Sequence, residues 1–422
     1  MAMAAEMPGQ RSETVRRANL SAIVRELHLH GPLSRSVLVA RTGLTRGGIR
    51  APIADLVAGK LVSEERSAPL GALGRPSVRV CPSPEGAVVL ALEIAVDSLA
   101  VAVVGLGGEV QYQARVDRPR GRFSAAETVA DLAAMSRPSL RQAPARDRLI
   151  GVGVAVVGMV RRADGLVALA PNLGWRDVAL GGEIAAAVGA DVPVSVANEA
   201  DLGALAESRR GAATGYRDVI FISGEVGVGG GLIIDGRPHT GSAGFGGEVG
   251  HMPVNPNGST CRCGAVGCWE TEIGERALLL RAGHPADGGR EEVEAVIREA
   301  VAGDAAALSA LDTVGRWLGF GLAGLTNILN PQLIVLGGLP GRLLPLIAPS
   351  VRDEFESHAL PASRASVEIV PATLGVDAPL LGAAELAFEP LLDDPASWVG
   401  PRTPGVAAGA RSQQKGLDGR RH

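Results

Sequence analysis

The sequence is short of aromatic residues, of lysine and of long apolar segments. Phe, Trp and Tyr make up 3% of its 422 residues, and lysine occurs only at Lys60 and Lys415. With so few aromatics, a hydrophobic core must rest on Ala, Val, Leu and Ile. Residues 1–13 lack the apolar region of a signal peptide, and no apolar run reaches the roughly 18–20 residues of a membrane helix. We therefore expect a cytoplasmic protein that has no contact with a membrane.

Cysteine is also scarce, and its spacing argues against a disulfide framework. Four cysteines occur, and Cys261, Cys263 and Cys268 lie within eight residues of one another, which is typical of a metal site in a cytosolic protein. His251 completes a set of four nitrogen and sulfur ligands, as tetrahedral Zn²⁺ requires. Because no ligand position stays open, the sequence predicts a structural Zn²⁺. The alternative is a set of reduced cysteines without metal.

Positive charge is concentrated at the amino-terminal end. The net charge of the chain is −4, yet residues 1–80 carry 12 Lys and Arg against 6 Asp and Glu. A basic segment on an acidic body indicates that only this segment contacts a polyanion, although so small an excess also arises by chance.

Residues 14–80 have the pattern of a winged helix-turn-helix domain. Apolar spacing predicts three short helices, followed by two strands around a Gly/Pro-rich tip. These elements are expected at residues 14–30, 35–41, 45 to about 58, and 61–80. Ser34 and Thr45 can cap the second and third helices, and Gly59 can end the third.

In such a domain the third helix enters the major groove of DNA. Arginine suits this position because its planar fork pairs with guanine edges or phosphates. The expected DNA contacts are Ser34, Arg35, Thr45, Arg46, Arg50 and, in the wing, Arg75. Gly47 and Gly48 cost this helix about 1 kcal/mol each relative to alanine, and a close approach to the DNA backbone would explain them. The alternative is a three-helix protein-interaction module.

A linker at 81–87 leads to a larger α/β body over residues 88–390. Strand meanders followed by alternating helices and strands occur twice, which predicts two lobes around a cleft. The lobes are expected at about 88–200, together with the C-terminal helix, and at about 201–375. The predicted strands lie within 88–116 and at 149–158, 192–198, 218–223, 231–236, 331–338 and 367–372; the predicted helices lie at 125–136, 199–210, within 291–329 and at 378–388. The tail, 391–422, lacks periodicity and is expected to be disordered.

Two further features of the body have less specific patterns. The glycine-rich run 224–231 either cradles phosphate through its backbone N–H groups or forms a tight turn against another backbone. Asn198, Glu199, Glu248 and Glu270 are carboxylates and amides of the kind that bind sugar hydroxyls. Each alone is more often a surface residue, but Glu248 and Glu270 bracket the cysteine-rich loop.

Together these segments resemble the ROK family, named for repressors, open reading frames and kinases. The resemblance covers about residues 15–390 and is strongest in GEVGHMPVNPNGSTCRCGAVGCWE at 247–270. APNLGW at 170–175, NEADLGALAE at 198–207 and NILNPQLIVLGG at 327–338 also match. The head resembles the winged helix of the family's repressors, including the Gly-Arg-Pro wing at 74–76.

The resemblance implies an actin-like fold, two lobes around a cleft that binds a sugar and, in the kinases, ATP. It implies zinc on His251, Cys261, Cys263 and Cys268. It implies sugar contacts from Asn172, Asn198, Glu199, Glu248, His251 and Glu270. His251 would then serve both sites, with one ring nitrogen on zinc and the other on a sugar hydroxyl.

The departures from the family pattern separate regulator from kinase. ROK kinases open with Asp-x-Gly-Gly-Thr, where this chain has residues 93–97, Glu-Ile-Ala-Val-Asp. The second phosphate loop, usually Gly-Thr-Gly, reads Glu225-Val226-Gly227. Glu199 stands where kinases place an aspartate base, and a misplacement of about 1 Å can lower a rate about a hundredfold. These changes predict inefficient phosphoryl transfer.

We therefore predict a sugar-responsive DNA-binding regulator, a repressor of carbohydrate genes that acts as a homodimer or homotetramer. One alternative is an ATP-dependent sugar kinase with a DNA-binding appendage. Another is a regulator that no longer binds sugar and responds to a partner protein.

Overall fold

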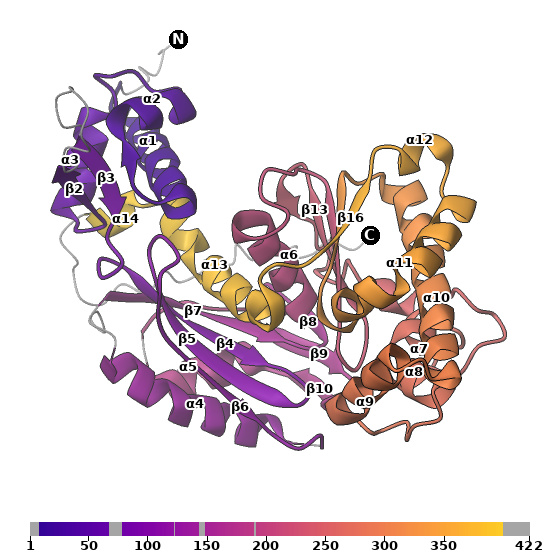
Figure 1. Ribbon diagram of the computed structural model, residues 1–422. Helices are drawn as coiled ribbons and strands as arrows, with labels where there is room; N and C mark the ends of the chain where they lie inside the picture. Colours follow the sequence, from indigo (N-terminus) through magenta and orange to yellow (C-terminus); the bar gives the residue numbers. More distant parts are fainter. Residues whose placement is uncertain (1–7, 67–77, 122, 143–147, 190, 400–422) are drawn as a thin grey trace, which may run out of the picture.

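The structure is a computed structural model, and it describes residues 8–66, 78–121, 123–142, 148–189 and 191–399. A small head stands on one end of a two-lobed body (Figure 1). The expected fold class is confirmed: a winged helix-turn-helix joined to an actin-like α/β body. None of the described helices has both the length and the apolar character needed to cross a membrane.

The head contains three helices and a three-stranded sheet of order β1-β3-β2. Its elements are α1 (Pro8–His30), β1 (Leu33–Ser34), α2 (Arg35–Thr42), α3 (Arg50–Ala58), β2 (Val62–Arg66) and β3 (Val78–Pro82). Ser34 caps α2 as predicted, since its Oγ accepts a hydrogen bond from the Val37 N–H at 3.3 Å. The wing with Arg75 lies outside the described residues.

The third helix begins later than the sequence predicted. Thr45 Oγ1 does accept the Gly48 N–H at 3.0 Å, but residues 46–49 form turns and α3 starts only at Arg50. Gly47 and Gly48 explain the delay, because glycine disfavours the helical backbone.

The first lobe is built on a five-stranded sheet of order β11-β7-β4-β5-β6. Strands β4 to β6 form the predicted antiparallel meander, while β7 and β11 run parallel to β4. The strands are β4 (Val88–Ile94), β5 (Ser98–Gly105), β6 (Val110–Asp117), β7 (Leu149–Val156) and β11 (Val194–Asn198). Helices α4 (Ala125–Gln142) and α5 (Leu180–Val188) lie on one face and α13 (Ala378–Asp393) on the other (Figure 1). A small sheet that the sequence did not reveal comprises β8 (Met159–Arg161), β9 (Leu166–Ala170) and β10 (Trp175–Val178).

The second lobe has a sheet of order β14-β13-β12-β15-β16. Its strands are β12 (Val219–Ser223), β13 (Gly229–Ile234), β14 (Arg237–Pro238), β15 (Leu333–Leu336) and β16 (Glu368–Pro371). Helix α6 (Glu199–Arg210) packs between this sheet and α13. The other elements of the lobe are η2 (Val249–His251), α7 (Glu270–Ile273), α8 (Glu275–Arg281), α9 (Arg290–Val301), α10 (Ala305–Leu329), α11 (Gly338–His358), α12 (Pro361–Arg364) and η3 (Gly375–Asp377).

The head and the body share one hydrophobic core. Leu20, Ile23 and Leu27 of α1 are fully buried in the same cluster as Phe388 and Leu391 of α13. The junction is therefore packed, and the predicted linker at 81–87 is partly structured, since β3 extends to Pro82.

The prediction of a disordered tail from residue 391 was wrong for its first part. Helix α13 continues to Asp393, and α14 (Ala396–Val399) follows it. Leu391 and Leu392 are buried, and Trp398 packs against the same core, so contact with the head orders a segment that local composition marked as irregular. Residues 400–422 lie outside the described part of the chain.

Candidate functional site: a polar cleft beside a cysteine cluster

A cleft between the two lobes brings together all six residues that the sequence suggested for sugar binding. Its lining includes Asn172, Asn198, Glu199, Glu248, His251 and Glu270. They come from the β9–β10 turn, the end of β11, the first turns of α6 and α7, and the segment around η2. The lining thus offers both hydrogen-bond donors and acceptors, as a polyhydroxylated ligand requires.

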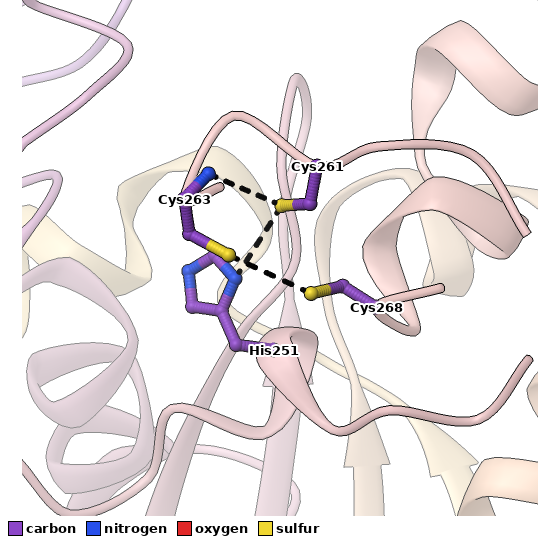
Figure 2. A group of neighbouring side chains, drawn as sticks. All are labelled: His251, Cys261, Cys263 and Cys268. Carbon is purple, nitrogen blue, oxygen red and sulfur yellow. Dashed lines mark hydrogen bonds between the residues drawn. The ribbon is translucent and has the colours of Figure 1, made fainter. Parts of the chain in front are cut away.

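The four predicted metal ligands lie together (Figure 2), and two of them, His251 and Cys263, line the cleft. The ligand atoms of His251, Cys261, Cys263 and Cys268 all lie within 4.8 Å of one another. Cys263 Sγ is 3.6 Å from Cys268 Sγ, and Cys261 Sγ is 3.7 Å from His251 Nδ1. Tetrahedral zinc at about 2.3 Å from sulfur needs sulfur atoms about 3.8 Å apart. The donor set and its spacing therefore fit a tetrahedral metal ion.

Two carboxylates connect the cysteine cluster with the cleft. Glu248 Oε2 is 3.8 Å from His251 Nε2, and Glu270 Oε1 accepts a hydrogen bond from the Cys261 thiol at 2.8 Å. Burial raises the pKa of Glu248, and Glu270 raises it further, although the nearby His251 acts to lower it. The position of this cleft wall therefore depends on the geometry of the cluster.

The start of α6 brings Asn198 and Glu199 into the lining of the same cleft. Asn198 caps the helix, because its Oδ1 accepts the Ala200 N–H at 2.7 Å, and its Nδ2 donates to Gly158 O at 2.9 Å. Burial, together with the charges of Glu93, Glu225 and Asp97, raises the pKa of Glu199 to about 8. Glu199 is thus protonated near neutral pH and can donate a hydrogen bond into the cleft.

Close packing explains why several positions of the glycine-rich hairpin at 224–231 are occupied by glycine. A Cβ on Gly231 would lie 2.4 Å from Ala200 O, and one on Gly224 would lie 1.9 Å from Gly227 O. A Cβ on Gly227 would point at Glu270 Oε2, 3.0 Å away. Of the two readings of this run, the tight turn against another backbone is the one these contacts support.

Ion pairs surround three carboxylates of the cleft lining, Glu93, Asp97 and Glu225. Glu93 pairs with Arg115 at 2.9 Å, Asp97 with Arg120 at 3.3 Å and with Arg290 at 3.4 Å, and Glu225 with Arg342 at 3.4 Å. The Asp97–Arg290 pair joins the two lobes. Each of these arginines thus already has a carboxylate partner.

Three arginines of the cleft escaped the sequence analysis: Arg115, Arg262 and Arg290. Arg262, between two predicted metal ligands, hydrogen-bonds Asn172 Oδ1 on the other lobe. No local motif marks such a residue, because its partner lies 90 positions away in the chain.

On the head, the predicted DNA contacts fall into two groups. Arg46 and Arg50 are exposed, and within the described residues their side chains have no hydrogen bond or ion pair. Arg35 instead pairs with Glu64 of β2, while Ser34 and Thr45 act as caps. Arg46 and Arg50 are therefore the most available to an external anion.

Comparison with known sequences places the body in one family. The ROK family model matches residues 89–389. The xylose repressor of Bacillus spizizenii is 30% identical over 383 residues, which cover 90% of this chain and 97% of the repressor. A glucokinase of Halalkalibacterium halodurans is 34% identical over 252 residues, 56% of this chain and 76% of the kinase.

The solved structures that match also include a full-length regulator and a shorter kinase. The crystal structure of a ROK family transcriptional regulator, a homolog of the E. coli MLC protein, matches with a TM-score of 0.75 at 28% identity and covers 90% of this chain and 97% of its own. A ROK glucokinase from Streptomyces griseus, solved with glucose and AMPPNP, matches with a TM-score of 0.61 at 29% identity and covers 71% of this chain and 99% of its own. The matches to the Bacillus spizizenii repressor and to the MLC-like regulator are long enough to include the head, whereas the two glucokinase matches have at most the length of the body.

Proposed function

This chain belongs to the ROK family, and we propose that it is a sugar-responsive transcriptional repressor that binds operator DNA through its winged helix-turn-helix head. The observation that carries this function is the coverage of the relatives. The xylose repressor and the MLC-like regulator align over 90% of the chain, whereas the Streptomyces griseus glucokinase aligns over 71% of it with 99% of its own chain. The head and the sugar-type cleft thus occur together in regulators.

The proposed effector is a sugar held between the lobes. Asn198, Glu248 and Glu270 would bond its hydroxyls, with Asn172 closing the site from the β9–β10 turn. Glu199, protonated because its pKa is raised to about 8, would donate where a kinase needs a base. A protonated carboxyl binds a hydroxyl well but does not take its proton.

The proposed metal is a structural Zn²⁺ on His251, Cys261, Cys263 and Cys268. With Nδ1 facing the thiols, His251 would keep Nε2 for Glu248 or for a sugar hydroxyl. When bound, the ion would fix the loop that carries Cys261 and the first turn of α7. Its role would be to hold the shape of the cleft wall.

A kinase function is disfavoured by the charges at the phosphate end of the cleft. Glu93, Asp97 and Glu225 present carboxylates there, and their arginine partners are occupied. Bringing ATP phosphates to this end would require separating several ion pairs and would leave like charges facing one another.

In the head, Arg46 and Arg50 would contact DNA bases or phosphates, with Ser34, Arg35, Thr45 and Arg75 completing the interface. The protein would act in the cytoplasm. A homodimer or homotetramer is proposed, because two-fold operators are read by two-fold symmetric proteins.

Direct titration tests the effector site. Calorimetry with D-xylose and with D-glucose, the sugars of the relatives' names, is expected to give saturable binding by one of them. Asn198→Ala should weaken that binding at least tenfold, while exposed Arg217→Ala on the second lobe should leave it unchanged. DNA binding without affinity for any sugar in a wider panel would instead favour a regulator that responds to a partner protein.

A further inference from the structure

Helix α6 extends from the effector cleft to the junction with the head. Its first residue, Glu199, and its cap, Asn198, line the cleft. Its last residue, Arg210, lies against α1 of the head. The helix therefore joins the site where the sugar is proposed to bind and the domain proposed to bind DNA.

Helix α6 is packed too tightly to bend independently of its neighbours. All residues from Ala200 to Glu207 are buried. A Cβ on Gly382 of α13 would lie 1.9 Å from Leu202 O, and one on Gly231 of β13 would lie 2.4 Å from Ala200 O. Glu207 also accepts the N–H groups of Thr373 and Leu374, just before the segment that lines the cleft. A displacement at the amino end of α6 is thus transmitted along the whole helix.

At its other end, the Arg210 guanidinium contacts three separate elements. Nη2 donates to His28 O of α1 at 3.3 Å, and Nη1 donates to Gly107 O, between β5 and β6, at 3.1 Å. Nε donates to Glu385 of α13. One side chain thereby joins the head to the body.

His28 completes this arrangement from the head. Its side chain is fully buried, and its Nδ1 accepts the Gly107 N–H at 3.1 Å. Its Nε2 lies 3.0 Å from Glu385 Oε2 and 2.9 Å from Arg210 Nη2, between the carboxylate and the guanidinium. Burial raises the pKa of Glu385, but His28, Arg210 and Arg209 outweigh that effect and hold the pKa below its usual range. Because an ionised buried carboxylate must keep its partners, these groups are expected to move together.

We propose that Arg210 is the positioning residue that couples the effector cleft to the head, by tying the end of α6 to His28 of α1 and to Gly107. The inference rests on the proposed function, since it assigns the regulation of that same site. Sugar binding at Asn198 and Glu199 shifts α6, and Arg210 passes the shift to α1, which packs against α3.

Arg210→Met tests this coupling, because it keeps most of the side-chain volume and removes the donors. Two quantities are measured: the affinity for D-xylose or D-glucose by calorimetry, and the affinity for DNA upstream of the protein's own gene by anisotropy, with and without that sugar. We expect the sugar dissociation constant to stay within about twofold. The sugar-induced change in DNA affinity, about tenfold for a typical allosteric coupling, should fall below about twofold.

Arg209→Met is the matched control. Arg209 is the preceding residue and also bonds Glu385, at 3.0 Å, but it reaches α1 only through Glu389, which accepts a hydrogen bond from Arg25, and not by a direct bond. It should retain the sugar response. Loss of the response in both variants would overturn the specific role of Arg210, as would a full response in folded Arg210→Met protein.

If Arg210→Met does not fold, Arg210→Lys decides. Lysine keeps the charge beside Glu385, but its single ammonium cannot span three acceptors in the planar geometry of arginine. Its sugar response should fall by at least half, and an unreduced response would overturn the inference. A wild-type protein that binds neither DNA nor either sugar would instead overturn the proposed function, which separates the two failures.

Discussion

His251 Nε2 lies 3.8 Å from Glu248 Oε2, on the cleft side of an imidazole whose Nδ1 faces Cys261. One residue thus belongs both to the proposed metal site and to the proposed sugar site. Loss of the metal is therefore expected to disturb the cleft, while the head, more distant in the fold, keeps its structure.

Cys263→Ser tests this dependence. Serine is a poor zinc ligand, so elemental analysis should find the variant without metal. Sugar should then no longer change its affinity for DNA. The head should keep its fold and still bind DNA. Cys81→Ala, which removes the cysteine outside the cluster, should keep the metal. A normal sugar response from zinc-free Cys263→Ser protein would contradict the proposed link.

The raised pKa of Glu199 predicts pH-dependent sugar binding. Below about pH 8 the carboxyl is protonated and donates; above it the proton is lost and Glu93, Glu225 and Asp97 repel the new charge. Sugar affinity should fall about tenfold between about pH 7 and about pH 9. Glu199→Gln, which always donates, should bind within about threefold of wild type at pH 7 and lose most of this dependence in calorimetric titrations. An equally steep fall in Glu199→Gln would assign the titration to another group.

The same shift has a consequence for stability. Because the folded-state pKa of Glu199 lies above its ordinary value of 4.5, the folded protein holds this proton more tightly than the unfolded chain. The contribution of this proton to the free energy of unfolding is complete below about pH 4.5 and is lost as the pH rises through about 8. Thermal unfolding of wild type and Glu199→Gln across this window should show a smaller decline in the variant. Parallel profiles would mean that Glu199 is already ionised at neutral pH.

Kinase activity should be absent. With ATP, Mg²⁺ and D-glucose or D-xylose, a coupled ADP assay is expected to give turnover at least a thousandfold below the roughly 1–100 per second typical of kinases. A ROK glucokinase assayed in parallel would serve as the positive control. Turnover within that range would restore the bifunctional alternative.

Arg46 and Arg50 are expected to carry much of the DNA affinity. Arg46→Ala and Arg50→Ala should each weaken binding by about 1–3 kcal/mol, and a phosphate contact would also lower the salt dependence. Arg217→Ala, an exposed arginine of the second lobe, is the control. Unchanged affinity in both head variants would favour the protein-interaction module as the role of the head.

The sequence predicted the features that depend on neighbours in the chain. Ser34 as a helix cap, the range 199–210 of α6, and the cysteine cluster all follow from local spacing. The order of residues 391–399 did not, because it arises from apolar contacts with a head that lies more than 300 positions earlier.

In the cleft and at the junction with the head, too, contacts between residues distant in the sequence could not be predicted. The carboxylates and amides of the cleft were found because family motifs mark them, whereas the Arg262–Asn172 contact and the Arg210–His28 contact join residues from separate elements. No periodicity reveals such pairs. Only the packing of the two lobes and the head brings them together.

The most direct test is fluorescence anisotropy of the purified protein on labelled DNA from upstream of its own gene, with and without a panel of common sugars. A sugar-dependent repressor should bind this DNA tightly at low salt, lose affinity as salt rises, and change its affinity at least fivefold with one sugar. Absence of binding at low salt under every sugar would contradict the account, and the ATP turnover assay would then decide whether the body is a working kinase.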